Sequence, residues 1–245
     1  MTHEKILEVK NLHSWYGSVH VLDGVTFSVY EGEIVVVLGT SGCGKTTLLK
    51  NIIRLYMPGE GSIRLLDHEM TELEEEEVEP VLKHVGVMYQ HGALLNSLTV
   101  GENVALPYEM HTSMSPGLRR EVAELKLRQV ELVDVFDKYP KELSGGMQKR
   151  AAVARAIAMD PRIIFCDEPS AGLDPVTAQD LDNLLITLNE TLGMTIVVVT
   201  HELESIKRIA HHIIYLDKGK VIFTGTLNEA FDALIPQIQK FFLQK

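Results

Sequence analysis

Residues 34–50 read Ile-Val-Val-Val-Leu-Gly-Thr-Ser-Gly-Cys-Gly-Lys-Thr-Thr-Leu-Leu-Lys, and this stretch decides the fold. Its first five residues are apolar, which predicts a short strand buried on both faces. Residues 39–46 then fit the spacing G-x-x-x-x-G-K-[ST]. From Lys45 onward an apolar stripe predicts a helix, and its members are Leu48, Leu49, Ile52, Ile53 and Leu55. A strand before the loop and a helix after it argue against a chance match in a glycine-rich turn.

A loop of this kind is suited to holding a triphosphate. Its glycines let the backbone wrap around phosphate groups, and the helix N-terminus adds partial positive charge. The Lys45 ammonium can reach the β- and γ-phosphates, and the Thr46 hydroxyl can ligate Mg²⁺. We expect the nucleotide site to include Gly39, Thr40, Ser41, Gly42, Cys43, Gly44, Lys45, Thr46 and Thr47.

Composition narrows the class of protein. The chain has 245 residues, enough for one domain with a subdomain, and its net charge of −11 disfavours general nucleic-acid binding. The longest apolar runs are too short to span a bilayer, and the N-terminus has no apolar signal region. Only two cysteines occur, which argues against a disulfide framework and suits a reducing cytosol.

Polar side chains follow three further predicted strands. Gln90 could offer its carbonyl oxygen to Mg²⁺, although a solvated loop glutamine is the simpler interpretation. Asp167 and Glu168 close an apolar run, where the first would bind Mg²⁺ and the second would polarise the attacking water. A structural acid pair is the alternative. The position of His201 at a strand end would place its imidazole beside the γ-phosphate. A purely structural histidine is the alternative.

A second anion-binding helix start is predicted at Leu143–Gln148. Ser144 is a good N-cap, and Gly145 and Gly146 expose backbone N–H groups. Lys149 and Arg150 do not suit a helix start but do suit a bound anion. Because one nucleotide needs only one phosphate loop, we expect this segment to bind the nucleotide of another copy of the chain. A simple capped helix is the alternative.

The remaining patterns outline the architecture. Alternating apolar residues predict strands at 6–9, 24–29 and 62–66, which suggest a small antiparallel layer, and a hairpin at 213–223. Residues 100–143 are mainly helical in pattern. Thr226 and Glu229 form a capping box for a last helix, and Ile238, Phe241 and Phe242 in the tail either form an interface or pack on their own domain. We expect one domain over 1–245, a helical subdomain at about 91–143 and a helical tail at about 226–245.

Over essentially its full length the chain resembles the nucleotide-binding subunit of ABC transporters. The resemblance is carried by Gly39–Thr46, Gln90, Leu143–Gln148, Asp167-Glu168, Gly172-Leu173-Asp174 and His201, in that family's order. It implies an α/β P-loop NTPase of the ABC type. In that fold a mostly parallel central sheet is flanked by helices, with an N-terminal antiparallel β layer and an inserted helical subdomain.

The resemblance also implies residue roles and partners. Tyr16 matches the aromatic that stacks on adenine, although in isolation it could simply pack on the sheet. Gln90 matches the residue that contacts the metal and senses the membrane partner. Ser144, Gly145 and Gly146 match the segment that closes over ATP held by the opposite subunit, and Asp174 matches the residue that links the two sites. The implied protein binds ATP and Mg²⁺, hydrolyses ATP, forms a head-to-tail dimer and attaches peripherally to an integral membrane permease at the cytoplasmic face of the inner membrane.

A finer resemblance concerns the cargo. Residues 90–104 and 168–175 are similar to the ATPases of Mla-type phospholipid transport systems. Those systems move phospholipids between the two membranes of Gram-negative bacteria, and their partners include an MCE-type lipid-binding protein and a STAS-domain protein. The short C-terminal end agrees with this expectation, because methionine- and sugar-importer ATPases carry a long regulatory domain there.

Two alternatives stay open. An amino-acid or other small-solute importer would differ mainly in the residues after Gln90. A soluble ABC protein acting on nucleic acid or ribosomes is disfavoured by the acidic charge. It is also disfavoured because the sequence has no coiled coil, zinc insertion or second ABC domain.

Overall fold

A computed structural model describes residues 4–242 of the chain. The ends of the expected 1–245 domain and the last three residues of the expected tail lie outside this range. The strands are β1 (Lys5–Tyr16), β2 (Val19–Tyr30), β3 (Ile34–Gly39), β4 (Glu60–Leu65), β5 (His68–Glu69), β6 (Val85–Met88), β7 (Ile163–Asp167), β8 (Thr195–Val199), β9 (His212–Asp217) and β10 (Lys220–Thr226). The helices are α1 (Lys45–Ile52), α2 (Glu75–Leu82), α3 (Val100–His111), α4 (Pro116–Gln129), α5 (Gly145–Ala156), α6 (Pro175–Leu192), α7 (Leu203–Ile209), α8 (Leu227–Asp232) and α9 (Pro236–Phe242), with a 3₁₀ turn η1 (Pro140–Glu142).

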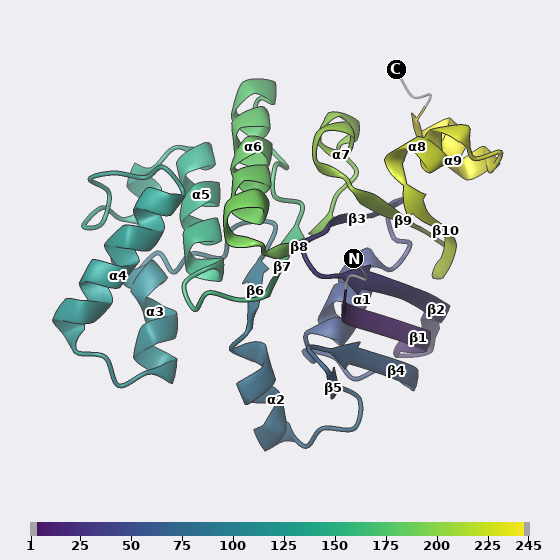
Figure 1. The fold of residues 1–245 in the computed structure, drawn as a ribbon, viewed down its shortest axis with the longest axis horizontal. Coiled ribbons are helices and arrows are strands. Elements are labelled where there is room, and N and C mark those ends of the chain that lie inside the picture. Colours follow the sequence, from purple (N-terminus) through teal and green to yellow (C-terminus); the bar gives the residue numbers. More distant parts are fainter. Residues whose placement is uncertain (1–3, 243–245) are drawn as a thin grey trace.

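Two sheets organise these elements (Figure 1). The larger has the order β10-β9-β3-β8-β7-β6, and all of its pairs are parallel except β10 with β9. The smaller is antiparallel, with the order β2-β1-β4-β5. The carboxyl ends of the parallel strands therefore lie along one edge of the large sheet, where α/β proteins of this kind bind ligands. The expected fold class is confirmed.

Strand β3 lies between two apolar layers. Every residue of β3 is buried, as its continuous apolar run predicted. Val36 and Leu38 point into a core shared with α5, α6 and α7, whereas Val35 and Val37 point into a core shared with α1 and the small sheet. Because neighbouring side chains of a strand face opposite ways, this one strand anchors both layers and fixes the loop that follows it.

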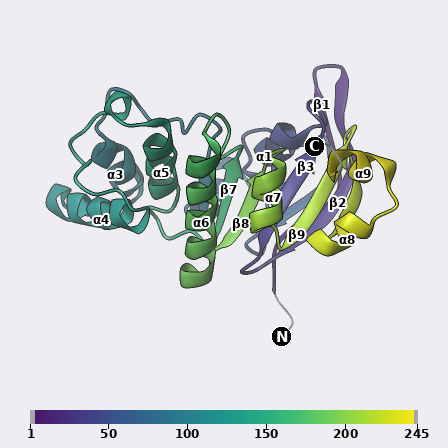
Figure 2. The same cartoon turned by 90° about the horizontal axis from the view of Figure 1, so that it is seen from above.

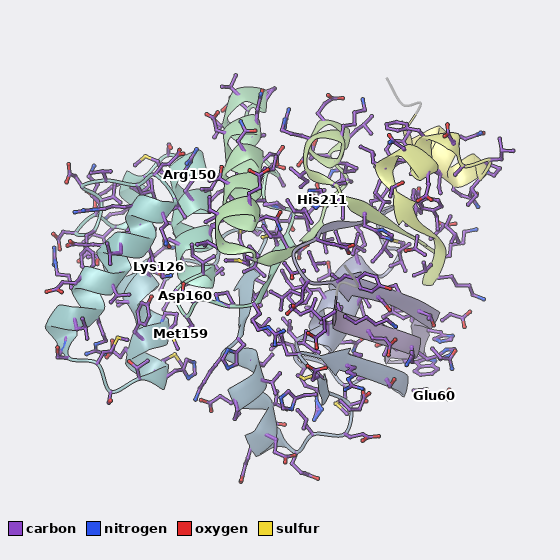
Figure 3. All side chains as sticks on the ribbon, viewed as in Figure 1. Glu60, Lys126, Arg150, Met159, Asp160 and His211 are labelled. Atoms are coloured by element: carbon purple, nitrogen blue, oxygen red, sulfur yellow. The ribbon has the colours of Figure 1, made fainter. Side chains whose placement is uncertain are left out.

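Helices α3, α4 and α5 gather at one end of the molecule, beyond the β6 edge of the large sheet (Figures 1 and 2). The ion pair between Lys126 of α4 and Asp160, just after α5, joins two of these helices (Figure 3). Lys126 is almost fully buried, so its paired ammonium is held by packing as well as by charge.

Several local expectations need correction. Strands β1 and β2 are 12 residues each and form one long hairpin, so both extend well beyond the predicted ranges 6–9 and 24–29, and Tyr16 is the last residue of β1. Leu55 is 60% exposed and does not join the stripe of α1, because that helix ends at Ile52. The two alternatives left open for the tail are decided and need no correction, because the tail packs on its own domain: Ile238 is fully buried, and Phe241 packs edge-on against Tyr215 at a ring separation of 5.9 Å.

Two other expectations are confirmed. The hairpin predicted at 213–223 is formed by β9 and β10, and the Thr226–Glu229 capping box begins α8.

Among the helices of residues 4–242, none combines the length and the apolar composition that a membrane span requires.

Candidate functional site

A cavity of about 650 Å³ lies at the carboxyl ends of β3, β7 and β8. Eight of the nine predicted loop residues line it, Cys43 being the exception. Gln90, Asp167, Glu168 and His201 line the same cavity. Polar groups that are separated by more than 100 residues in the sequence are thus brought to one site, as the strand-end reasoning predicted.

The loop takes its shape from close backbone approach. A side chain at Gly39 would meet the Leu216 carbonyl oxygen at 2.0 Å, so only glycine fits there. Gly44 has φ of 109° and precedes α1, and a side chain there would meet Leu22 at 2.7 Å. The Lys45 ammonium donates to the carbonyl oxygens of Gly39 and Thr40, at 2.8 and 3.2 Å. The loop therefore folds around its own lysine, with the N–H groups of the α1 N-terminus unused by side-chain caps.

Cys43 is turned away from the cavity and is buried. Burial raises the pKa of its thiol, so the sulfur stays protonated at neutral pH. The side chain therefore fills space beneath the loop, and any contribution of Cys43 to a nucleotide would come from its backbone.

Two adjacent carboxylates reach the cavity because the chain turns at Glu168. Asp167 ends β7, and Glu168 has φ of 47°, a left-handed conformation that is uncommon for a residue with a side chain. Its backbone is held by a hydrogen bond from its N–H to the Val199 carbonyl oxygen at 2.8 Å. The left-handed turn overcomes the alternation of strand side chains, which would otherwise send the two carboxylates in opposite directions.

The Glu168 carboxylate is fixed by neighbours from the end of β8. The Thr200 hydroxyl donates to Oε2 at 3.1 Å, and the Nδ1 atom of His201 lies 2.7 Å from Oε1. Burial, followed by the neighbouring Glu168 charge, raises the pKa of Asp167. The site thus holds two clustered acids, one oriented by hydrogen bonds and the other with a weakened tendency to ionise.

Lys149 links three parts of the chain. Its ammonium donates to the backbone carbonyl oxygens of Gln90 and Glu168, the latter at 3.3 Å. Burial lowers the pKa of this lysine, while the nearby carboxylates oppose that shift. The expectation that Lys149 and Arg150 present charge to an external anion is wrong for this chain. Lys149 is buried, and Arg150 pairs with Glu131 at 2.6 Å and with the Val130 carbonyl oxygen.

Five predicted residues lie outside the cavity of this single chain: Tyr16, Ser144, Gly145, Gly146 and Asp174. Ser144 caps α5 by accepting from the Met147 N–H, and its hydroxyl and Gly145 are exposed. Asp174 caps α6 by accepting from the N–H groups of Val176 and Thr177, both at 3.1 Å.

Tyr16 ends β1 with a ring that is 75% exposed and tilted against Tyr56. None of the five lines the phosphate-loop cavity, so their predicted roles stay predictions.

Sequence reasoning missed four contributors to the site. Val21, Val199 and Phe241 line the cavity, and Thr200 holds Glu168. Thr200 could have been found, because it lies between a buried strand and His201. Phe241 had no such signal, because its position depends on how α9 packs against Tyr215.

Comparisons with family models and with known proteins identify the same family. The ABC transporter family matches residues 22–171 of the chain. The methionine import ATP-binding protein MetN of Pasteurella multocida is 40% identical over 223 residues, which cover 91% of this chain and 64% of that relative's length. MetN of Clostridioides difficile is 38% identical, over 92% of this chain and 70% of the relative. The chain therefore spans about two thirds of the length of these relatives.

Solved structures agree. The dimeric bacterial ABC transporter cassette MJ0796 matches with a TM-score of 0.83 and 35% identity, covering 90% of this chain and 98% of that cassette. The cbiO1 protein of Clostridium perfringens, part of an ABC transporter complex, matches with a TM-score of 0.85 and 26% identity, covering 94% of this chain and 91% of that protein. With the phosphate loop, the paired acids and the histidine placed around one cavity, these matches show that the chain belongs to the ABC transporter family and is an ATPase domain of that family.

Proposed function

We propose that this chain is the ATP-hydrolysing subunit of an ABC importer for methionine or a similar small solute. The observation that carries the ATPase part is the position of Glu168, whose oriented carboxylate faces the cavity formed by the phosphate loop. The cargo part rests on the relatives described above, which are methionine import proteins.

The donor set suits ATP with Mg²⁺. The cavity combines a lysine and a helix N-terminus for phosphate groups with hydroxyl, amide and carboxylate oxygens, the ligands that Mg²⁺ prefers. Lys45 and the loop backbone would hold the phosphates, and Thr46, Gln90 and Asp167 would supply oxygens to the metal. When bound, Mg²⁺ would neutralise phosphate charge and so assist departure of the leaving group.

Glu168 would act on the attacking water. Its Oε1 and Oε2 atoms are held by His201 and Thr200, so the carboxylate is oriented before a nucleotide arrives. An oriented carboxylate can accept a proton as the water attacks phosphorus. His201 lines the cavity, is 60% exposed at its side chain and contacts Glu168 through Nδ1, while its Nε2 lies 3.8 Å from Glu202 Oε1. That separation is too long for a hydrogen bond, so Nε2 could still donate to the phosphate or the water.

A second copy of the chain would complete the site. In our proposal, Ser144, Gly145 and Gly146 close over the nucleotide held by the opposite copy, and Asp174 links the two sites. The support is that Ser144, Gly145 and Asp174 are exposed, Gly146 is half-buried beside them, and all four lie outside their own chain's cavity. The solved MJ0796 cassette is itself dimeric. ATP would then favour the closed dimer because it binds that state better than the open one.

The segment after Gln90 is the proposed contact with an integral membrane permease. Arg155 donates to the carbonyl oxygens of Gly92 and Ala93, both at 2.8 Å, and Asn103 bonds the backbone of Leu95 in both directions. The backbone is thus ordered while the Leu95 side chain is 45% exposed. Docking there would place the chain peripherally at the cytoplasmic face of the membrane.

Phospholipid transport is the second candidate, since residues 90–104 form this ordered segment and resemble Mla-type ATPases. In that case an MCE-type protein and a STAS-domain protein would be partners. The relatives described above favour small-solute import over this prediction.

A host strain from which the gene for this chain has been deleted distinguishes small-solute import from phospholipid transport. The wild-type chain is returned to one culture of this strain, and Lys45→Ala, which we expect to bind phosphate groups more weakly, is returned to another. Uptake of labelled methionine and other amino acids and the phospholipid content of the outer leaflet are then measured. Restoration of uptake by the wild-type chain alone supports the importer. Restoration of lipid content with unchanged uptake replaces it with the lipid transporter, and equal restoration by Lys45→Ala contradicts an ATP-driven role.

A further inference from the structure

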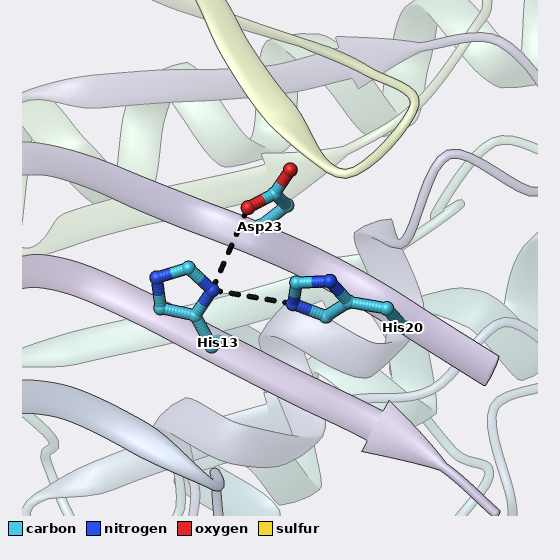
Figure 4. A group of neighbouring side chains, drawn as sticks. All are labelled: His13, His20 and Asp23. Carbon is cyan, nitrogen blue, oxygen red and sulfur yellow. Dashed lines mark hydrogen bonds and ion pairs between the residues drawn. The ribbon is translucent and has the colours of Figure 1, made fainter. Parts of the chain in front are cut away.

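Three side chains that can ligate a metal converge on the β1–β2 hairpin, outside the nucleotide cavity (Figure 4). His13 comes from β1, and His20 and Asp23 come from β2. The His13 Nδ1 atom lies 3.2 Å from His20 Nε2 and 3.6 Å from Asp23 Oδ1. One ligand atom of each residue lies within 4.8 Å of the others, and among residues 4–242 no other set of three or more His, Cys, Asp or Glu residues meets this condition.

We propose that His13, His20 and Asp23 bind a divalent transition-metal ion, with Zn²⁺ as the best fit. In a tetrahedral site with bonds of about 2.0–2.1 Å, neighbouring ligand atoms lie about 3.3 Å apart. The two distances from His13 Nδ1 are close to this value. The third edge, between His20 and Asp23, is no longer than 4.8 Å, and a small rotation of the half-exposed Asp23 side chain alone would shorten it. Two imidazoles and one carboxylate are typical zinc ligands, and water would take the fourth position.

The His20 ring is already held in place. It stacks on Trp15 with ring centroids 4.4 Å apart and planes 5° from parallel. Trp15 is itself fixed, because the Tyr56 hydroxyl donates to its carbonyl oxygen at 2.7 Å and its ring covers Gly59 so closely that a side chain there would lie 2.3 Å away. Pre-positioned ligands lose less freedom when a metal binds.

A hydrogen bond and an ion pair hold these side chains together without a metal. His13 and His20 share a hydrogen bond, and the Lys220 ammonium pairs with Asp23 Oδ2 at 2.9 Å. Lys220 lowers the pKa of Asp23, so the carboxylate is ionised at neutral pH. Because Lys220 uses Oδ2, the Oδ1 atom facing His13 stays available, but the nearby positive charge opposes a cation. Removal of the Lys220 charge should therefore strengthen metal binding, whereas removal of a ligand should weaken it.

The test uses the untagged full chain, stripped of metals with a chelator and free of nucleotide. Calorimetric titration with Zn²⁺ should show one saturable equivalent. His20→Phe keeps an aromatic ring on Trp15 but removes the ligand nitrogen, and we expect it to weaken Zn²⁺ binding at least about tenfold. Asp23→Asn should weaken binding in the same direction. Lys220→Gln should strengthen it, because it removes the opposing charge. His68→Ala, an exposed histidine on β5, is the matched control and should bind as the wild-type chain does.

A second readout locates the ion. Trp15 is the chain's only tryptophan and lies against His20, so its fluorescence should change as Zn²⁺ binds and should saturate with the calorimetric signal. Zn²⁺ should also raise the melting temperature of the wild-type chain but not that of His20→Phe. The proposal is overturned if the chain shows no saturable binding, or if His20→Phe and Asp23→Asn bind Zn²⁺ as tightly as His68→Ala.

Discussion

The Nδ1 atom of His201 lies 2.7 Å from Oε1 of Glu168, and the two residues come from the ends of neighbouring strands. The contact fixes one carboxylate oxygen, while the Thr200 hydroxyl fixes the other at 3.1 Å. The paired β7 and β8 strands therefore deliver an oriented carboxylate to the cavity before a nucleotide binds. This relationship, more than either residue alone, supports Glu168 as the group that acts on water.

Glu168→Gln should reduce ATP hydrolysis at least about a hundredfold, because the amide cannot accept the proton of the attacking water. ATP affinity should change little, since the phosphate loop is untouched. Phosphate release and ATP binding measured on the same preparation check both parts. Glu190→Gln, which removes an exposed carboxylate near the C-terminal end of α6, is the control and should retain turnover. Near-normal turnover of Glu168→Gln would remove Glu168 from its proposed role.

Lys45→Ala should lower ATP affinity itself, because it removes the ammonium from the centre of the phosphate loop. We expect a loss of about tenfold or more, equivalent to at least about 1.4 kcal/mol. Binding of ATP, measured by calorimetry, is the readout. Lys50→Ala changes an exposed lysine further along α1 and should bind ATP nearly as the wild-type chain does. Equal affinities for the two variants would contradict the assignment of the loop.

Lys149→Met should destabilise the chain by about 1–3 kcal/mol, because the buried bond to the Glu168 carbonyl oxygen and the partly buried bond to that of Gln90 lose their donor, while the side-chain volume is nearly kept. The free energy of unfolding in urea measures the effect. Lys141→Met, at an exposed position in η1, should change that free energy by less than about 0.5 kcal/mol. If the two variants are equally stable, Lys149 does not hold Gln90 and Glu168 together.

Asp167→Asn should stabilise the folded chain at neutral pH by about 0.5–2 kcal/mol, while weakening any Mg²⁺ dependence of activity. Burial raises the pKa of Asp167 in the folded state, so ionisation of this group costs folding free energy at every pH above the raised pKa. Below the pKa of the unfolded chain the group is protonated in both states, and this cost disappears. The stability difference between the variant and the wild-type chain should therefore shrink as the pH falls. A difference that is constant with pH would contradict a buried, ionised Asp167.

Much of the site could be predicted because its signals are local. The loop at residues 39–47 depends on glycine positions that only a tight backbone tolerates, and a side chain at Gly39 would indeed meet backbone at 2.0 Å. Gln90, Asp167, Glu168 and His201 follow apolar runs, and parallel strands bring their carboxyl ends to one edge. Bringing these four side chains to one cavity required only that their strands be parallel and neighbouring in the sheet.

Other features depend on tertiary packing and were not predictable. Lys149 follows the glycines of α5, and its position in the sequence suggests an outward cation, but the folded chain turns it to Gln90 and Glu168. The left-handed turn at Glu168 has no sequence signal, because glutamate rarely adopts that conformation. The grouping of His13, His20 and Asp23 follows from the pairing of two strands and matches no motif.

Two copies of the chain should hold ATP between them, and the molar mass of Glu168→Gln in solution tests this shared site most directly. Light scattering after size-exclusion chromatography should give a monomer without nucleotide and a dimer with ATP and Mg²⁺. Adding Gly145→Glu should abolish the dimer without unfolding the chain. Gly145 is exposed, a side chain there meets only Leu173 at 3.6 Å, and an acidic residue suits a helix start while repelling phosphate. A dimer that forms equally with both variants, or a monomer under every condition, would contradict the shared site.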